Sequence, residues 1–77
     1  MSAIIADIER NEKEIIRIEV SEFKGKELIN LRIWYYHQEG EYRPTPKGVA
    51  LDISKYEQLK EAVDKIGIYI KEKETNS

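Results

Sequence analysis

The sequence predicts an α+β domain in which a four-stranded antiparallel β-meander is followed by one C-terminal α-helix. Three observations support this fold class. Apolar and polar residues alternate with a period of two through the middle of the chain. Glycines and prolines interrupt that region where turns are needed. A single apolar stripe with helical spacing comes after it, near the C-terminus.

The size of the chain adds an expectation about assembly. Its 77 residues, 40% hydrophobic and 36% charged, suffice for one domain. A core of this size rarely supplies more than about 3–5 kcal/mol of net stability. There is no cysteine to form a disulfide or to ligate zinc. Oligomerisation is the remaining way to bury more surface, so we expect a homodimer.

The first residues of the chain are ambiguous. Ile4, Ile5 and Ile8 could line one side of a short helix, but no capping residue supports that helix. We expect residues 1–13 to form an arm that is frayed or docked on a partner. The single domain is expected over residues 14–70, and the polar residues 71–77 are expected to form a flexible tail.

Two strands joined by a tight turn come next. Ile16, Ile18 and Val20 alternate with polar residues, which is typical of a half-buried strand. The tetrapeptide at residues 23–26, FKGK, supplies a glycine where a tight turn favours positive φ. Residues 28–36 predict a second strand. Its two faces carry Ile29, Leu31, Ile33 and Tyr35 on one side and Asn30, Arg32, Trp34 and Tyr36 on the other.

Two shorter strands are expected before the helix. Residues 41–43 are extended, but Pro44 and Pro46 confine that strand to a sheet edge or a short length. Residues 48–53 predict the fourth strand. Ser54 and Glu57 then form a capping box at the start of a helix. Gly67 is placed to end that helix or to bend it.

The helix carries an apolar stripe that needs a partner surface. One helix covers only one face of a four-stranded sheet, and that small face is barely enough to bury the stripe. A two-fold contact between two copies would bury the rest. We therefore assign the dimer interface to the four residues of the stripe, which are Tyr56, Leu59, Val63 and Ile66.

Catalysis, metal binding and membrane insertion have little support. His37 is the only histidine, and the four glycines are isolated rather than grouped in a phosphate-binding motif. We expect no enzyme activity, no metal and no cofactor. No apolar run approaches the roughly 18 residues of a membrane span, and the first residues do not resemble a signal peptide. We expect a cytoplasmic protein, associated with the nucleoid if the source is prokaryotic.

The aromatic and basic residues are more informative than the net charge. A net charge of −2 does not by itself suggest nucleic-acid binding. However, the run at residues 32–36, RIWYY, places three aromatic rings beside an arginine at one strand end. Flat π faces next to cations are what unpaired bases stack on. The same rings could instead pack in a small core or a subunit interface.

Several stretches resemble one known family. Residues 22–32, EFKGKELINLR, are similar to the start of the DNA-binding domain of the transcriptional coactivator positive cofactor 4 family. The similarity continues through residues 39–41, 44–51 and 56–61, and covers residues 14–66. The resemblance implies a four-stranded antiparallel sheet with a helix, a dimer formed through the helix and a strand, and binding of single-stranded or melted DNA. The chain looks like the short prokaryotic type.

The resemblance also implies a set of nucleic-acid contacts. Phe23 matches a phenylalanine that stacks on bases, Lys26 and Lys47 match lysines that contact the backbone, and Arg32 matches an arginine of the second strand. The complete expected site is Phe23, Lys24, Lys26, Arg32, Trp34, Tyr35, Arg43 and Lys47.

Two positions depart from the family pattern. Tyr35 stands where the family has a stacking tryptophan, with Trp34 one place earlier, so either ring could be the platform. Strict alternation places the two rings on opposite faces, whereas a bulge would turn both outward. Glu14 stands where the family has a lysine, which would weaken a phosphate contact.

Together these features predict a homodimer that binds single-stranded DNA, or RNA, with little sequence preference and supports transcription, repair or replication. An alternative is a protein-interaction module of the transcription machinery with incidental nucleic-acid binding, which the negative net charge and Glu14 favour. A third is a structural domain whose aromatic residues are simply buried. Titration with oligo-dT and with the matching duplex separates the first prediction from the other two.

Overall fold

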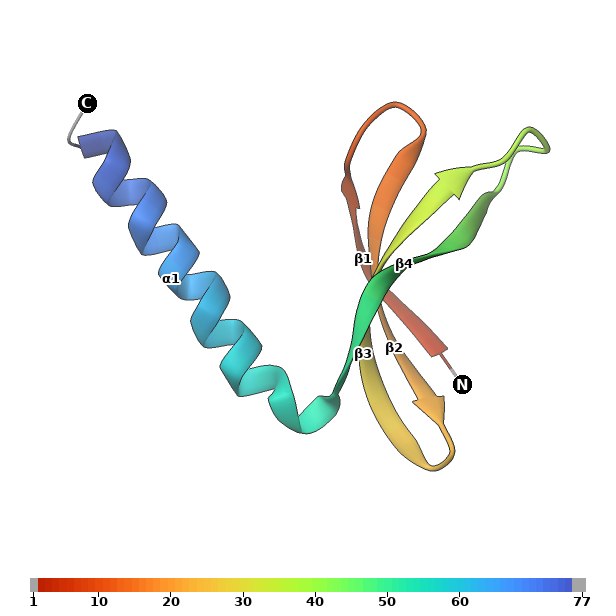
Figure 1. Cartoon of the computed structure of the whole chain (residues 1–77), viewed down its shortest axis with the longest axis horizontal. Coiled ribbons are helices and arrows are strands. Elements are labelled where there is room, and N and C mark those ends of the chain that lie inside the picture. The colour runs from red at the N-terminus through yellow and green to blue at the C-terminus, as the bar shows by residue number, and fades with distance from the viewer. Residues whose placement is uncertain (1, 76–77) are drawn as a thin grey trace.

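The computed structural model describes residues 2–75, which form one sheet and one long helix (Figure 1). The four strands are antiparallel and lie in the order β1-β2-β3-β4. The predicted β-meander followed by a C-terminal helix is therefore confirmed. The elements are β1 (Ser2–Glu9), β2 (Glu14–Phe23), β3 (Lys26–Tyr36), β4 (Tyr42–Asp52), the 3₁₀ helix η1 (Ile53–Lys55) and α1 (Tyr56–Thr75).

The N-terminal residues form a strand, so the expected arm is wrong for Ser2–Glu9. This strand, β1, pairs with β2 along its whole length and makes one edge of the sheet. The pairing register shifts between Ile4 and Ala6, so that Ile5 is an extra residue in the strand. An extra residue interrupts the alternation of apolar and polar positions. The bulge therefore explains why the spacing of the isoleucines looks helical.

The β2–β3 hairpin has the tight turn that was predicted at FKGK. Lys24 and Gly25 both have positive φ, of 52° and 79°, which is the conformation of a two-residue hairpin turn. Phe23 pairs with Lys26 directly across this turn. A two-residue loop determines the register of the whole hairpin. As a result, Arg17 lies opposite Arg32 and Ile15 lies opposite Trp34.

The two short strands expected at residues 41–43 and 48–53 are one continuous strand, β4. It lies at the second edge of the sheet, where a proline that cannot donate a hydrogen bond is tolerated. The β3–β4 register shifts between Arg32 and Trp34, which pair with Gly48 and Pro44 respectively. The extra residues therefore lie in β4, opposite Ile33, and β4 bulges there instead of ending.

The helix starts differently from the expected capping box. The carboxylate of Asp52 accepts a hydrogen bond from the backbone N–H of Ser54 at 3.0 Å and caps η1. That hydrogen bond holds the pKa of Asp52 below its usual value. Ser54 therefore lies inside the first turn, and its hydroxyl is not the cap. The α-helix begins one turn later, at Tyr56.

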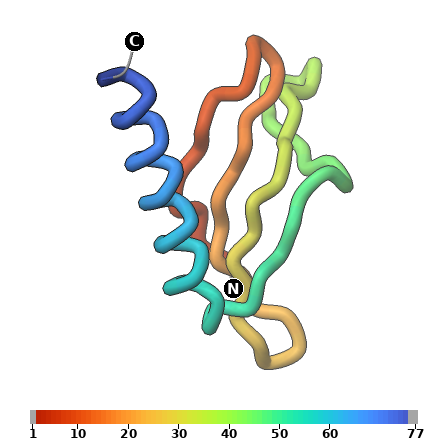
Figure 2. The backbone as a smooth tube through the Cα atoms, turned by 60° about the vertical axis from the view of Figure 1, so that its left-hand side comes forward, coloured from red at the N-terminus to blue at the C-terminus, as the bar shows by residue number. Residues whose placement is uncertain are grey.

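The helix continues further than expected. It passes through Gly67 without ending and reaches Thr75. The expected flexible tail at residues 71–77 is thus helical as far as Thr75, and its last two residues lie outside the described range. Every residue of α1 is exposed except Leu59, which is half-buried. In Figure 1 the helix leaves the end of β4 and extends away from the sheet, and in the view of Figure 2 its axis runs in much the same direction as the strands. The expectation that α1 covers its own sheet is therefore wrong.

The sheet has one apolar and one polar face. The apolar face carries the side chains that alternate toward it from the two central strands, which are Ile16, Ile18, Val20, Ile29, Leu31 and Ile33. Most of them are only half-buried, because no element within residues 2–75 covers this face. The polar face carries Arg17, Phe23, Lys26, Arg32 and Trp34. Only Ile15 and Ile29 are buried hydrophobic residues among the described part of the chain.

Candidate nucleic-acid interface

The polar face places five of its aromatic and basic side chains along the β2–β3 hairpin. Phe23 and Lys26 pair at the turn, Arg17 and Arg32 pair near the middle, and Trp34 lies toward the other end. At about 3.4 Å per residue, the path from Phe23 to Ile15, the partner of Trp34, measures about 27 Å. The sheet therefore holds aromatic and cationic groups in one line, as a nucleic-acid strand requires.

The turn end of this line is open to solvent. Phe23 is 61% exposed, which is unusual for a residue whose side chain gains from burial. The ammonium group of Lys24 lies 5.3 Å from the centroid of this ring. Lys26 is directly across the hairpin from Phe23. The structure therefore brings together three of the residues expected at the site, an exposed flat ring and two cations.

Arg32 is positioned by the bulge in β4. Its Nη1 donates to the carbonyl oxygen of Thr45 at 3.1 Å, and the Thr45 hydroxyl donates to the carbonyl of Ile33 at 2.7 Å. The backbone N–H of Lys47 donates to the same hydroxyl oxygen at 3.2 Å. Thr45 thus links the bulge to β3 and sets the backbone position of Lys47 near Arg32.

Gly48 allows β4 to approach Arg32 closely. A β-carbon at Gly48 would lie 2.6 Å from the carbonyl oxygen of Leu31 and 2.8 Å from the α-carbon of Arg32. Because both are backbone atoms, the strands would have to separate. We expect Gly48→Ala to lower the free energy of unfolding by about 1–3 kcal/mol, measured by chemical denaturation.

A matched control is available in the helix. A β-carbon at Gly67 would have no atom within 4 Å, and this position is helical. Gly67→Ala should therefore stabilise the protein by about 0.5–1 kcal/mol through helix propensity. If both alanine variants change stability equally, the close approach at Gly48 has no energetic role.

The aromatic residues at the end of β3 lie on opposite faces. The β2–β3 register is unbroken through Trp34 and Tyr35, which pair with Ile15 and Glu14. The bulge is in β4, so it does not turn Tyr35 toward the polar face. Tyr35 therefore shares the apolar face with the isoleucines, and Trp34 shares the polar face with Arg32. This is the arrangement that strict alternation predicts.

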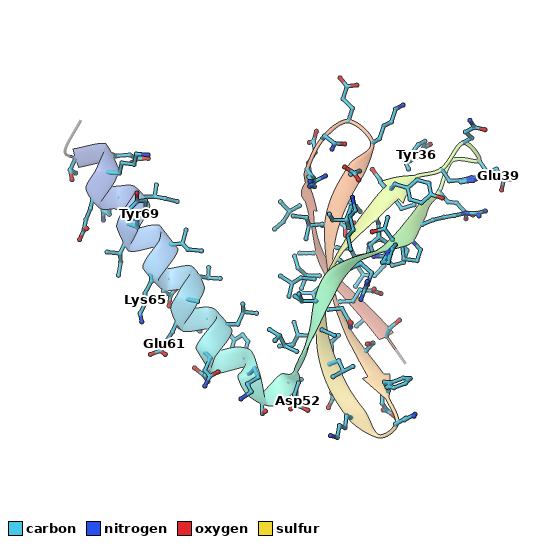
Figure 3. The ribbon with its side chains drawn as sticks, in the orientation of Figure 1. Tyr36, Glu39, Asp52, Glu61, Lys65 and Tyr69 are labelled. Atoms are coloured by element: carbon cyan, nitrogen blue, oxygen red, sulfur yellow. The ribbon has the colours of Figure 1, made fainter. Side chains whose placement is uncertain are left out.

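Arg43 and Glu14 are engaged with neighbours at the ends of the strands. Nη2 of Arg43 lies 3.3 Å from Glu41 and 3.6 Å from Glu39, on the β3–β4 turn whose tip is visible in Figure 3. The carboxylate of Glu14 accepts hydrogen bonds from Asn11 and Arg10 in the β1–β2 turn. The Asn11 hydrogen bond is the main cause that lowers the pKa of Glu14. The charge of Arg43, one of the cations expected at the nucleic-acid site, is therefore already balanced by Glu39 and Glu41.

A cluster around Arg17 was not expected. The Arg17 guanidinium carbon lies 4.6 Å from the centroid of the Trp34 ring and 5.8 Å from that of Tyr42. Nε and Nη2 donate to the two carboxylate oxygens of Asp7 at 2.9 and 3.1 Å. These contacts cover part of the Trp34 ring. Its Nε1 is buried and finds no hydrogen-bond acceptor within residues 2–75. Trp34 therefore supports Arg17, and its ring is less accessible than that of Phe23.

The ion pair also shifts the pKa of both partners. The hydrogen bond from Arg17 lowers the pKa of Asp7 below its usual value, and the same bond raises the pKa of Arg17. Both groups are therefore charged throughout the neutral pH range.

Part of this cluster carried a signal in the sequence. A two-residue hairpin loop at Lys24-Gly25 implies the register in which Arg17 faces Arg32. The contribution of Asp7 carried no such signal, because it depends on β1 being a strand.

Two other kinds of site are not found in the described chain. Across residues 2–75, no three histidine, aspartate or glutamate side chains are placed so that they could hold a metal ion. In the same range, no helix is both long and apolar enough to cross a membrane.

Sequence and structure comparisons point to the same family. Residues 10–62 match the family described as Transcriptional Coactivator p15 (PC4). The RNA polymerase II transcriptional coactivator KELP of Arabidopsis thaliana is 34% identical over 59 residues, which are 77% of this chain and 35% of that protein. The chain thus spans about a third of the length of this relative.

Two solved structures share the fold. A PC4 homolog from Burkholderia pseudomallei has a TM-score of 0.79 and 20% identity, with 86% of this chain and 89% of that chain covered. The MoSub1 chain in a MoSub1–DNA complex has a TM-score of 0.62 and 25% identity, with 88% and 83% covered. Both similarities include the meander and the helix that follows it.

Proposed function

Because this chain belongs to the transcriptional coactivator p15 (PC4) family, we propose that it is a homodimer that binds single-stranded nucleic acid through the polar face of each sheet. The protein acts by binding, without catalysis. The similar MoSub1 chain was solved in complex with DNA, and the similar KELP protein is a transcriptional coactivator. A role of this chain in transcription, or in DNA repair or replication, follows from the same proposal.

The observation that carries the proposal is the line of side chains on the polar face. Phe23 offers an exposed ring for base stacking. Lys24 lies in the hairpin turn, Lys26 at the start of β3 and Lys47 in the edge strand β4, where they can reach phosphates. Stacking on aromatic rings does not depend on base identity, so the binding tolerates different sequences. A paired duplex hides its base faces and cannot use Phe23 in this way.

The exposed surface supports a dimer. The chain exposes 6538 Å², whereas a compact monomer of 9.1 kDa exposes about 4,900 Å². Its radius of gyration is 15.2 Å, against roughly 11.5 Å for a compact domain of this length. The excess of about 1,600 Å² per chain corresponds to a dimer interface of roughly 3,000 Å², the size of an obligate interface.

The two uncovered apolar surfaces are complementary. The helix exposes the stripe of Tyr56, Val63 and Ile66, and the sheet exposes its apolar face. Glu61 and Lys65 lie on the side of α1 that points away from the sheet in Figure 3. In the proposed dimer, α1 of each protomer helps to cover the apolar face of the other. Both polar faces then stay free for nucleic acid.

Binding should be tested by titrating labelled oligo-dT and the matching duplex, with Trp34 emission as a second signal. We expect oligo-dT to bind and the duplex to bind much more weakly. With three or four phosphate contacts, the slope of log K against log salt should be about −2 to −3. Equal affinity for both, or no binding to either, would contradict the proposal.

A further inference from the structure

Two arginines lie directly opposite each other on the polar face. Arg17 in β2 pairs with Arg32 in β3. Like charges in such a pair are destabilising, because their β-carbons are only about 4.5–5.5 Å apart. Arg32 is hydrogen-bonded to a neutral carbonyl, that of Thr45, and Arg17 is bound by the carboxylate of Asp7. Asp7 balances Arg17, which Glu19 also attracts, whereas Arg32 contacts no carboxylate within residues 2–75, so the arginine pair can attract a further anion.

Asp7 binds Arg17 in the geometry that a phosphate would use. Two nitrogens of Arg17 donate to the two carboxylate oxygens, and guanidinium groups pair with phosphate in the same bidentate way. The rings of Trp34 and Tyr42 keep the guanidinium in place. The Asp7 side chain is 37% exposed and comes from the edge strand β1. A ligand can therefore approach the ion pair from outside the sheet.

We propose that Arg17 and Arg32 form a binding site for one phosphodiester group of the bound strand, and that Asp7 competes with this phosphate for Arg17. The inference rests on the proposed function and adds that Asp7 limits the affinity of the protein for single-stranded nucleic acid. Binding exchanges a carboxylate for a phosphate on Arg17. The Arg17 side chain is only 14% exposed, so the phosphate has to replace the bidentate pairing of Asp7 and cannot add to it. Because Asp7 stays charged at neutral pH, the exchange requires no protonation.

The test is the variant Asp7→Asn, which removes the competing charge and keeps the side-chain shape. We expect its affinity for oligo-dT to rise by about three- to tenfold. The slope of log K against log salt should become steeper by about 0.7, because in the wild-type chain the displaced Asp7 carboxylate takes up a cation and offsets the release from one phosphate contact. The control is Asp64→Asn, which removes the same charge from the exposed Lys60–Asp64 pair on α1. It should leave the slope unchanged.

A second background shows whether Asp7 acts through Arg17. In an Arg17→Gln chain, Asp7→Asn should not raise the affinity for oligo-dT, because the guanidinium group for which Asp7 and phosphate compete is absent. An equal gain in both backgrounds would indicate general charge repulsion and would overturn the inference. A loss of affinity in Asp7→Asn would show that Asp7 only positions Arg17, which also overturns it.

Folding and the proposed function are controlled separately. Thermal unfolding of each variant checks that it is folded. If the Asp7→Asn variant does not fold, the Asp7→Ser variant replaces it, because it removes the same charge. If the wild-type chain binds oligo-dT and the affinity of Asp7→Asn is unchanged, only this inference fails. If the wild-type chain binds no single strand at all, the proposed function fails.

Discussion

Replacing Val63 by aspartate should separate the dimer into monomers that are poorly folded. Val63 lies in the middle of the helix stripe, where the proposed interface would surround the new charge with apolar side chains. An unpaired charge in such a place costs about 3–5 kcal/mol, so the dimer dissociation constant should rise roughly 100-fold or more. Sedimentation velocity over a concentration series measures this change.

Ile68→Asp is the matched control. Val63 is 55% exposed in the protomer and Ile68 is 58% exposed, so the protomer alone gives no reason for different effects. The two residues lie about 140° apart around the helix, which places Ile68 on the far side from the stripe. We expect the Ile68 variant to stay dimeric. Equal effects of the two substitutions would argue that the stripe is not an interface.

Replacing Phe23 by alanine should weaken binding of single-stranded nucleic acid with little change in stability. The ring is largely exposed, so the folded protein loses few contacts. A base stacked on an aromatic ring is stabilised by about 1–3 kcal/mol, which predicts a loss of roughly 5- to 150-fold in affinity. Fluorescence anisotropy with labelled oligo-dT measures the loss, and denaturant unfolding measures the stability.

Two further substitutions at Phe23 separate stacking from simple apolar contact. Phe23→Tyr keeps a π face and should retain most of the affinity, whereas Phe23→Leu keeps apolar bulk and should lose most of it. If leucine binds as well as phenylalanine, the ring does not act by stacking.

The sequence was sufficient for the fold class and for the two faces of the hairpin. The alternation in β2 and β3 and the glycine turn at FKGK together determine which side chains share a face, so Arg32 and Trp34 could be placed correctly. Local bulges were the main reason why the edge strands could not be predicted correctly. The extra residue at Ile5 hid β1, and the bulge opposite Ile33 made β4 look like two strands.

Packing between distant elements could not be predicted from local patterns. The stripe on α1 indicated that it needs a partner surface, but periodicity cannot say whether that surface belongs to the same chain. The structure shows α1 extended away from its own sheet (Figure 1). For the same reason the Asp7–Arg17 pair was missed, since it requires β1 to be placed beside β2.

Native mass spectrometry of the wild-type chain with oligo-dT and with the matching duplex tests the central claim most directly, because it reports assembly and binding in one spectrum. The account predicts the mass of two chains without ligand, and complexes of two chains with single-stranded oligo-dT. It also predicts little complex with the duplex. A single chain as the main species, or complexes formed with the duplex as readily as with the single strand, would contradict the account.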